Sequence, residues 1–168
     1  MRNTFDRFNG RHQDYQAARP SYAQEFLDWL GELYAPPERY TAADIGSGTG
    51  KLSAQLLAAG FRVCGVEPNP DMRGAAEALL GGDPRFSSSN GTDHDTGLPD
   101  RSVDMVAAAQ AFHWFDGPAF ARECRRILRP GGRAVLVWNV RGSAPMNQAL
   151  AQVFREHCPS FHGFTGGM

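Results

Sequence analysis

A glycine-rich turn between two short apolar segments constrains the fold of this chain more than any other feature. The first segment ends at Ala43-Asp44-Ile45, the turn is Gly46-Ser47-Gly48-Thr49-Gly50, and Phe61 to Glu67 has the pattern of a second strand. Between them the leucines follow helical spacing, and Gly60 stands where a left-handed helix C-cap is expected. A strand, a turn, a helix and a strand in so short a stretch predict a βαβ unit.

The same alternation continues on both sides of this unit. A capping box at Ser21 to Gln24 precedes a predicted helix that Pro36-Pro37 ends. The later predicted elements are a helix over Asp71–Leu80, strands at Arg85–Ser89 and Val103–Ala109, a helix opened by Gly117-Pro118, a turn at Pro130–Gly132, a strand over Arg133–Val140 and a helix over Met146–His157. Such alternation predicts an α/β fold with a mostly parallel sheet covered on both faces. We expect one domain over residues 1–168, with an N-terminal segment and helix (1–40), a core (41–140) and a C-terminal part (141–168).

Composition excludes several classes of protein. Hydrophobic residues make up 42% of the 168 residues, and no apolar run approaches the roughly 18 residues of a membrane span. The formal net charge of −1 provides no general attraction to nucleic acid or acidic membranes. Together with the polar N-terminus, these features favour a cytoplasmic protein. Cys64, Cys124 and Cys158 are too few and too far apart for a disulfide framework, so we interpret them as buried thiols.

Ligands of open α/β sheets bind at the carboxyl ends of the strands, which directs attention to Asp44 and Glu67. Asp44 stands shortly before a GxGxG turn, which differs from the GxGxxG of dinucleotide sites. An acid there disfavours a phosphate and favours a ligand with ammonium and sulfonium groups, because opposite charges attract strongly in a partly desolvated cleft. Glu67 ends the second predicted strand, where a carboxylate can accept hydrogen bonds from both hydroxyls of a ribose.

Five segments resemble the motifs of class I S-adenosylmethionine-dependent methyltransferases. They are ADIGSGTG at 43–50, GVEPNPDM at 65–72, LPDRSVDMV at 98–106, AFHWFD at 111–116 and LRPGG at 128–132. The stretch from Tyr15 to Tyr22, with Arg19-Pro20, resembles the N-terminal segment of a subgroup that acts on small molecules. The resemblance covers roughly residues 12–158. It is specific for the cofactor, S-adenosyl-L-methionine, and does not identify the methyl acceptor.

The resemblance implies a role in cofactor binding for ten residues. Asp44, Gly46 and Gly48 would hold the methionine part of the cofactor, Glu67 would bind the ribose, and Pro68 and Asn69 would lie near the adenine. Thr92 and Asp93 occupy the place of the adenine-amine site, where the family commonly has an acid followed by Ala-Glu and this chain has Thr-Asp-His. Gln110 would line the space near the reactive methyl group. Arg19 would reach the carboxylate of the cofactor.

The acceptor side is less defined, and no catalytic residue is assigned. His113 follows the fourth strand and is a candidate general base because the pKa of histidine lies near neutrality, but packing or helix capping is the favoured role. His157, Cys158 and His162 fall short of a zinc set, so no metal is expected. A group of arginines is interpreted as a solvated helix face with no role in nucleic-acid binding: Arg122, Arg125, Arg126, Arg129 and Arg133.

The sequence therefore predicts a Rossmann-like sheet of order 3-2-1-4-5, without the two further strands usual in the family, and methyl transfer to a small-molecule acceptor. A non-catalytic S-adenosylmethionine-binding module is the alternative, and a NAD-type oxidoreductase is disfavoured by the GxGxG spacing. If the sheet ends at the fifth strand, Ala134 to Trp138 forms an exposed apolar edge. We expect self-association through that edge.

Overall fold

The computed structural model describes residues 21–139 and residue 152. The chain divides into two units, residues 1–137 and 138–168, and the elements below belong to the first. They are α2 (Gln24–Leu33), η2 (Pro37–Arg39), β1 (Thr41–Ile45), α3 (Lys51–Ala58), β2 (Arg62–Val66), α4 (Pro70–Leu80), β3 (Phe86–Ser89), β4 (Val103–Ala109), η3 (Phe112–Trp114), α5 (Gly117–Ile127) and β5 (Leu128–Val137). None of the helices in the described ranges is long and apolar enough to cross a membrane.

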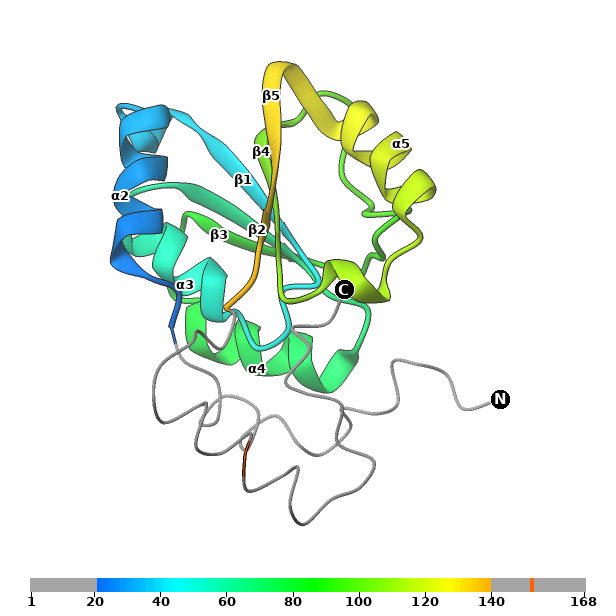
Figure 1. Cartoon of the computed structure of the whole chain (residues 1–168). Coiled ribbons are helices and arrows are strands. Elements are labelled where there is room, and N and C mark those ends of the chain that lie inside the picture. Colours follow the sequence, from blue (N-terminus) through cyan, green and yellow to red (C-terminus); the bar gives the residue numbers. More distant parts are fainter. Residues whose placement is uncertain (1–20, 140–151, 153–168) are drawn as a thin grey trace. The chain divides into compact units, whose positions relative to one another are not determined.

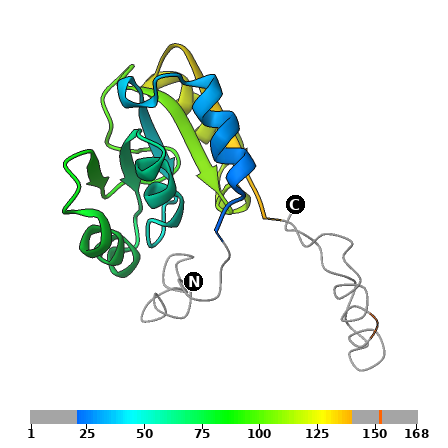
Figure 2. The same cartoon turned by 90° about the vertical axis from the view of Figure 1, so that its left-hand side faces the viewer.

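The strands form one twisted sheet with helices packed along it (Figure 1 and Figure 2). Its order is β3-β2-β1-β4-β5, and every neighbouring pair is parallel, which confirms the predicted 3-2-1-4-5 order. Because all strands run the same way, their carboxyl ends meet at one edge of the sheet. The prediction that the sheet lacks two further strands concerns residues beyond 139, which, apart from Gln152, lie outside the described part of the chain.

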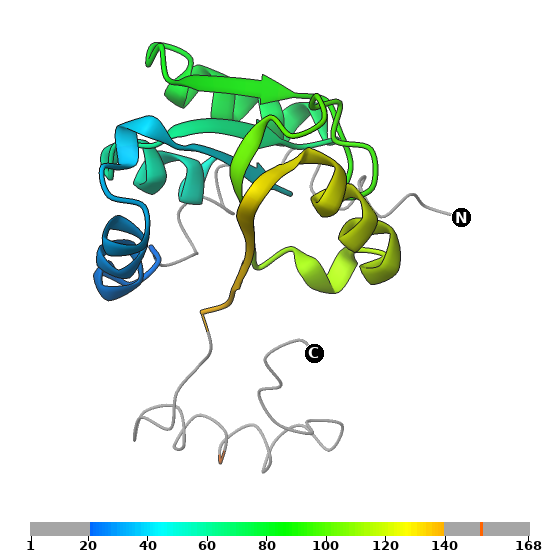
Figure 3. The ribbon, with the colours of Figure 1, turned by 90° about the horizontal axis from the view of Figure 1, so that it is seen from above.

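Each face of the sheet carries its own apolar core. Ala42 of β1 and Met105 of β4 pack with α2 and α3, whereas their neighbours Ala43 and Val106 pack with α5. This alternation follows from the two-residue period of a strand. Helix α5 covers the face opposite to α2 and α3 (Figure 3), so the sheet is buried on both sides, as predicted for a parallel sheet.

The helix C-cap predicted at Gly60 is confirmed. Gly60 has a φ of +106°. Its N–H donates to the carbonyl of Leu57 and the N–H of Phe61 to that of Leu56, which is a Schellman motif. Phe61 is thereby turned into the core, where it is fully buried.

The predicted capping box at the start of the first helix is wrong. Helix α2 begins at Gln24 with Ala23 as N-cap and no side-chain cap hydrogen bond. The Gln24 amide instead donates to Asp28 one turn ahead, at 2.9 Å. The backbone of Tyr22 exchanges two hydrogen bonds of 3.0 Å with the Gln55 side chain of α3. A long-range contact to a neighbouring helix therefore replaces the local motif.

The turn predicted before the last strand lies inside β5. Strand β5 begins at Leu128, opposite Val103, and the register shifts before Arg133 pairs with Met105. The extra residues, which include Gly131 with a φ of +84°, form an irregularity of the bulge type. The strand ends at Val137, and the described residues Trp138 and Asn139 are not part of it, so the predicted extension to Val140 is wrong. Leu136 of β5 is 38% exposed, and pairing of this strand with a second chain stays a prediction.

Cys64 and Cys124 are free and buried, as predicted, and Cys158 lies outside the described residues. Burial raises the pKa of both thiols, that of Cys124 to about 11. Both therefore stay protonated at neutral pH and behave as small apolar side chains.

Candidate functional site

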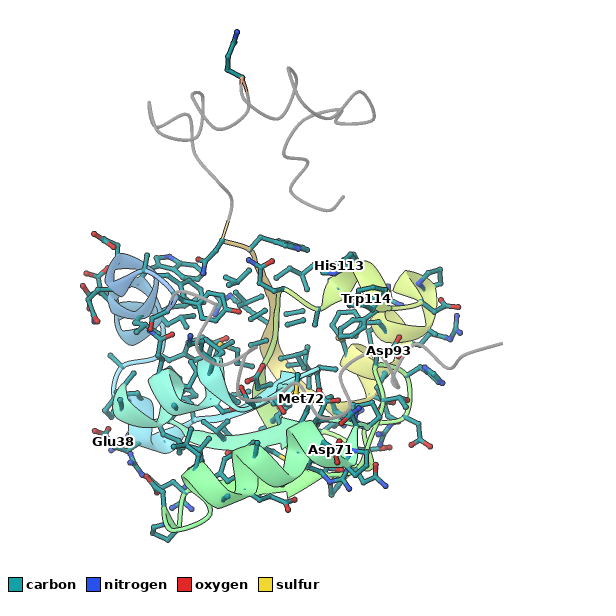
Figure 4. All side chains as sticks on the ribbon, turned by 90° about the horizontal axis from the view of Figure 1, so that it is seen from below. Glu38, Asp71, Met72, Asp93, His113 and Trp114 are labelled. Atoms are coloured by element: carbon teal, nitrogen blue, oxygen red, sulfur yellow. The ribbon has the colours of Figure 1, made fainter. Side chains whose placement is uncertain are left out.

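A cavity of about 310 Å³ lies at the carboxyl ends of four neighbouring strands. Its lining residues follow β1, β2, β3 and β4: Gly46, Gly48, Glu67, Pro68, Asn69, Met72, Thr92, Asp93, His94, Ala109, Gln110, Ala111, Trp114, Phe115 and Asp116. Figure 4 shows Met72 of α4, Asp93 of the loop between β3 and β4, and Trp114 of η3, which follows β4. The cavity lies where ligands of open α/β sheets bind.

The structure brings most of the sequence-predicted cofactor residues together around this cavity. The predicted residues that line it are Gly46, Gly48, Glu67, Pro68, Asn69, Thr92, Asp93 and Gln110. Asp44 is not among them, and Arg19 lies outside the described residues. The role of each in binding a cofactor stays a prediction.

The glycine turn after β1 is packed so tightly that its first glycine leaves no room for a side chain. Gly46 has a φ of +69°, and a Cβ placed on it would lie 2.8 Å from the Cβ of Ala111 and 3.3 Å from the ring of Phe115. Its N–H donates to the carbonyl of Val66 at 2.8 Å. Only glycine allows this backbone to approach the segment after β4 so closely.

Glu67 joins the turn after β1 to the loop after β2. Its Oε2 accepts a hydrogen bond from the N–H of Gly48 and its Oε1 one from the N–H of Asn69, both at 2.9 Å. The residue is 9% exposed, and burial raises the pKa of its carboxyl, while the two N–H donors lower it. A carboxylate has about four lone-pair positions, so this one can still accept two hydrogen bonds from a ligand.

Asn69 is the N-cap of α4. Its Oδ1 accepts hydrogen bonds from the N–H groups of Asp71 and Met72, each at 3.0 Å. The cap stabilises the helix start and places Met72 at the cavity. The side-chain oxygen is therefore engaged within the protein.

Asp44 lies within β1 and away from the cavity. It is 1% exposed, and its Oδ2 accepts a 2.7 Å hydrogen bond from the hydroxyl of Ser53 on α3. Burial raises the pKa of Asp44 to about 6, opposed by the hydrogen bonds from Ser53. In this arrangement the side chain ties β1 to α3, and a direct contact with a ligand in the cavity has no support in the geometry.

The loop after β3 carries Thr92, Asp93 and His94 into the cavity wall. Asp93 Oδ2 accepts a hydrogen bond from the N–H of Asp116 at 3.0 Å, and Oδ1 lies 3.0 Å from Nδ1 of His94. The Oγ1 of Thr92 accepts from the N–H of Asp95 at 3.1 Å. The side chain of His94 is 56% exposed, and it also lines the cavity.

The segment after β4 begins with a residue in an uncommon backbone conformation. Gln110 has a φ of +56°, which a residue with a side chain adopts rarely and which often marks a functional site. Phe112 and Phe115 pack against Phe120 of α5, with ring centroids 5.7 and 5.2 Å from that ring. These anchors leave His113 and Trp114 on the outside, and Trp114 is 48% exposed. His113 is exposed and does not line the cavity.

The cavity is lined by acidic and neutral groups. Glu67, Asp93 and Asp116 are its carboxylates, and no lysine or arginine is found among the described lining residues. This charge distribution suits a ligand that carries positive charge and opposes a pyrophosphate. The histidines and cysteine once considered as metal ligands, His157, Cys158 and His162, lie outside the described residues.

Sequence reasoning missed several lining residues. They are Met72, Ala109, Ala111, Trp114, Phe115 and Asp116. Most of them follow directly after β4, so the rule that ligands bind at strand ends would have found them if applied to every strand.

A family model for a methyltransferase domain matches residues 43–136, the stretch that supplies the whole cavity. The chain belongs to this methyltransferase family. An uncharacterised methyltransferase of Mycobacterium tuberculosis is 42% identical over 127 residues, which are 76% of this chain and 49% of that protein. An uncharacterised methyltransferase of Schizosaccharomyces pombe is 31% identical over 145 residues, 85% of this chain and 57% of that protein. The chain thus spans about half the length of the curated relatives it matches.

Solved structures of methyltransferases share the fold. A candidate type II methyltransferase from Anaeromyxobacter dehalogenans superimposes with a TM-score of 0.66 at 36% identity, over 83% of this chain and 56% of that chain. A candidate methyltransferase of an antibiotic biosynthesis pathway from Anabaena variabilis has a TM-score of 0.62 at 27% identity, over 80% and 54%. Both resemblances cover the methyltransferase fold described above.

Proposed function

We propose that this methyltransferase domain binds S-adenosylmethionine in the cavity and transfers its methyl group to a small-molecule acceptor. The proposal depends mainly on the position and the hydrogen bonds of Glu67. It is a mostly buried carboxylate that lines the cavity, and two backbone N–H groups hold its two oxygens in place. A carboxylate so fixed at the end of the second strand matches the chemistry of two adjacent ribose hydroxyls.

The residues around the cavity fit the parts of this cofactor. Gly46 and Gly48 would expose backbone to the methionine part, because both have a positive φ, which favours glycine. Pro68 and Met72, with the loop of Thr92 and Asp93, would bound the adenine. When bound, the cofactor supplies a methyl group that is already electrophilic because it is attached to a positively charged sulfur. Glu67, Asp93 and Asp116 favour that positive charge over an anionic ligand.

The contribution of the protein is then orientation and exclusion of water. Methyl transfer to a nucleophile depends on alignment, which a cavity that holds cofactor and acceptor side by side would provide. Gln110 and Trp114 follow β4 and line the cavity, so they would bound the acceptor side. His113 lies next to Trp114, with ring centroids 5.0 Å apart, but it is exposed and does not line the cavity, so no general base is assigned.

A small molecule is the proposed acceptor. Two arginines at the end of α5 and the start of β5 are engaged with carboxylates of the chain: Arg126 with Glu123 and Asp100, and Arg129 with Asp104. Arginines held in such pairs are poorly placed to contact a phosphate backbone.

Thermal unfolding with added ligands tests the proposal. A ligand that binds only the folded state raises the melting temperature, so S-adenosylhomocysteine should do so, while NAD and NADP should not. A shift with NAD and none with S-adenosylhomocysteine would instead support an oxidoreductase. Tight cofactor binding without transfer of a labelled methyl group to any of a panel of small acceptors would identify a non-catalytic binding module.

A further inference from the structure

A second polar cluster lies between helix α5 and the loop that follows β3. It comprises Thr96, Asp100, Glu123 and Arg126. Thr96 is 1% exposed and Glu123 is 7% exposed, and neither lines the cavity. Burying a carboxylate costs free energy unless it is paired and hydrogen-bonded. A carboxylate as buried as that of Glu123 therefore needs specific partners inside the protein.

Four donors converge on the Glu123 carboxylate. Oε1 accepts from the N–H of Thr96 at 2.8 Å, from its hydroxyl at 2.6 Å and from Nη2 of Arg126 at 2.7 Å. Oε2 accepts from Nε of Arg126 at 2.8 Å. Arg126 also donates to Asp100 at 2.7 Å, farther along the same loop. These donors lower the pKa of Glu123 to about 2, so the carboxylate is charged at neutral pH.

Thr96 in turn determines the path of the loop. Its carbonyl accepts a 2.7 Å hydrogen bond from the hydroxyl of Ser89 at the end of β3. Gly91 passes so close to that carbonyl that a Cβ would collide with it. Between these points, the N–H of Thr92 donates to the carbonyl of Asp95 at 2.8 Å. The loop is thus folded back on Thr96, and this fold directs Thr92 and Asp93 into the cavity wall.

The same loop is also held at the other end of α5. Asp93 accepts a hydrogen bond from the N–H of Asp116, and Asp116 is the N-cap of α5 through its bond to the N–H of Ala119. Helix α5 therefore contacts the loop at two places. Asp116 makes the contact at the N-terminus of the helix, and Glu123 makes the other further along the helix. The two contacts fall on Asp93 and Thr96, so they hold the loop at one lining residue and three residues further along.

We propose that Glu123 is a positioning residue for the ligand cavity: by binding Thr96 it holds Thr92 and Asp93 in the cavity wall. The identity of the ligand rests on the proposed function, whereas the ordering of the loop does not. Glu123 itself lies outside the cavity, so its effect on binding must pass through the loop.

Two substitutions at Glu123 test this role in the full chain. Glu123→Leu removes the acceptor for Thr96 and the charge for Arg126, whereas Glu123→Gln keeps an oxygen that can accept from Thr96. Loss of a residue that orients a binding group commonly weakens affinity on the order of tenfold. We expect that loss for S-adenosylhomocysteine with Glu123→Leu, and a smaller loss with Glu123→Gln. Calorimetric titration well below the melting temperatures measures both.

A neighbouring substitution separates positioning from general stability. Cys124→Ala removes a buried group from the apolar core under α5, next in sequence to Glu123. We expect it to lower the melting temperature while the affinity stays unchanged. Hydrogen exchange of the ligand-free chain should show faster exchange of the Thr92 and Thr96 amides in Glu123→Leu, and no change there in Cys124→Ala.

The outcomes distinguish the two proposals. Unchanged exchange at Thr92 and Thr96 in folded Glu123→Leu would overturn the positioning role, as would equal affinity loss in Cys124→Ala and Glu123→Leu. Absence of S-adenosylhomocysteine binding by the unsubstituted chain would overturn the proposed function, and the exchange measurement would then still decide the role of Glu123.

Discussion

The N–H of Gly48 donates a 2.9 Å hydrogen bond to Oε2 of Glu67, and this contact joins the ends of two neighbouring strands. The turn after β1 and the loop after β2 thereby form one wall of the cavity. Removing the carboxylate would free that N–H and loosen the wall from which the proposed ribose contact is made.

Glu67→Ala is expected to weaken binding of S-adenosylhomocysteine by about 2–4 kcal/mol, because two charged hydrogen bonds to the ligand are lost. The fold should survive, since the residue follows a strand end and is not part of the apolar core. Titration calorimetry measures the change. Glu77→Ala is the matched control, because Glu77 lies on α4 with a half-exposed side chain in a 3.7 Å ion pair with Arg73. Equal affinity of a folded Glu67→Ala and the parent would contradict the ribose assignment.

Gly46→Ala is expected to lower the free energy of unfolding by about 1–3 kcal/mol, from a strained positive φ and a forced contact with Ala111. Denaturant unfolding measures the loss. Gly74→Ala is expected to raise the free energy of unfolding instead. Gly74 lies inside α4 with nothing within 4 Å of an added Cβ, so alanine should stabilise the chain by about 1 kcal/mol. A neutral Gly46→Ala would show that the segment after β4 can move away from the turn.

The stability of the chain is expected to fall as the pH rises from about 4 to above 6, through the contribution of Asp44. The folded carboxyl has a pKa of about 6 and the unfolded one about 4, so the folded state holds the extra proton in that window. The full effect is about 3 kcal/mol. Asp44→Asn should abolish this contribution, while Glu25→Gln at an exposed helix position should leave it. The free energy of unfolding is measured at pH 4.5 and 7.5. If it changes between these pH values by the same amount in Asp44→Asn and in the parent, the assignment to Asp44 is wrong.

Glu123 should produce the opposite dependence at lower pH. Its folded pKa of about 2 lies below its unfolded value, so its stabilisation is complete above about pH 4.5 and is lost as the pH falls through 2. Glu123→Gln should remove about 3 kcal/mol of that acid sensitivity. Unfolding monitored between pH 2 and 5 measures it, and an unchanged slope in the variant would assign the acid sensitivity to other carboxylates.

Arg122 and Arg125 are exposed on α5 and are expected to contribute no specific nucleic-acid binding. Fluorescence anisotropy with DNA and RNA at low salt should show weak binding at most, because the neighbouring Arg126 and Arg129 are paired with carboxylates. Tight binding that Arg122→Gln and Arg125→Gln abolish would overturn the small-molecule proposal.

The sequence by itself determined the succession of strands and helices along the chain, because hydrophobic periodicity and glycine placement are local signals. Val103–Ala109 was predicted with the observed bounds, and Gly60 was assigned correctly as a helix C-cap. Glu67 could be placed at the end of its strand for the same reason. In each case a few neighbouring residues contain all the information that the backbone needs.

Only the tertiary structure decided which side chains meet. Asp44 accepts a hydrogen bond from Ser53, because the two-residue period of β1 directs it, like Ala42, to the α2 and α3 face; its role toward the cofactor stays a prediction. The Ser21 capping box was displaced by Gln55, which comes from another helix. No pattern in the sequence assigned Glu123 a functional role, and only the fold places it against Thr96 in the loop after β3. Such contacts depend on how distant segments pack, and no local pattern in the sequence records that.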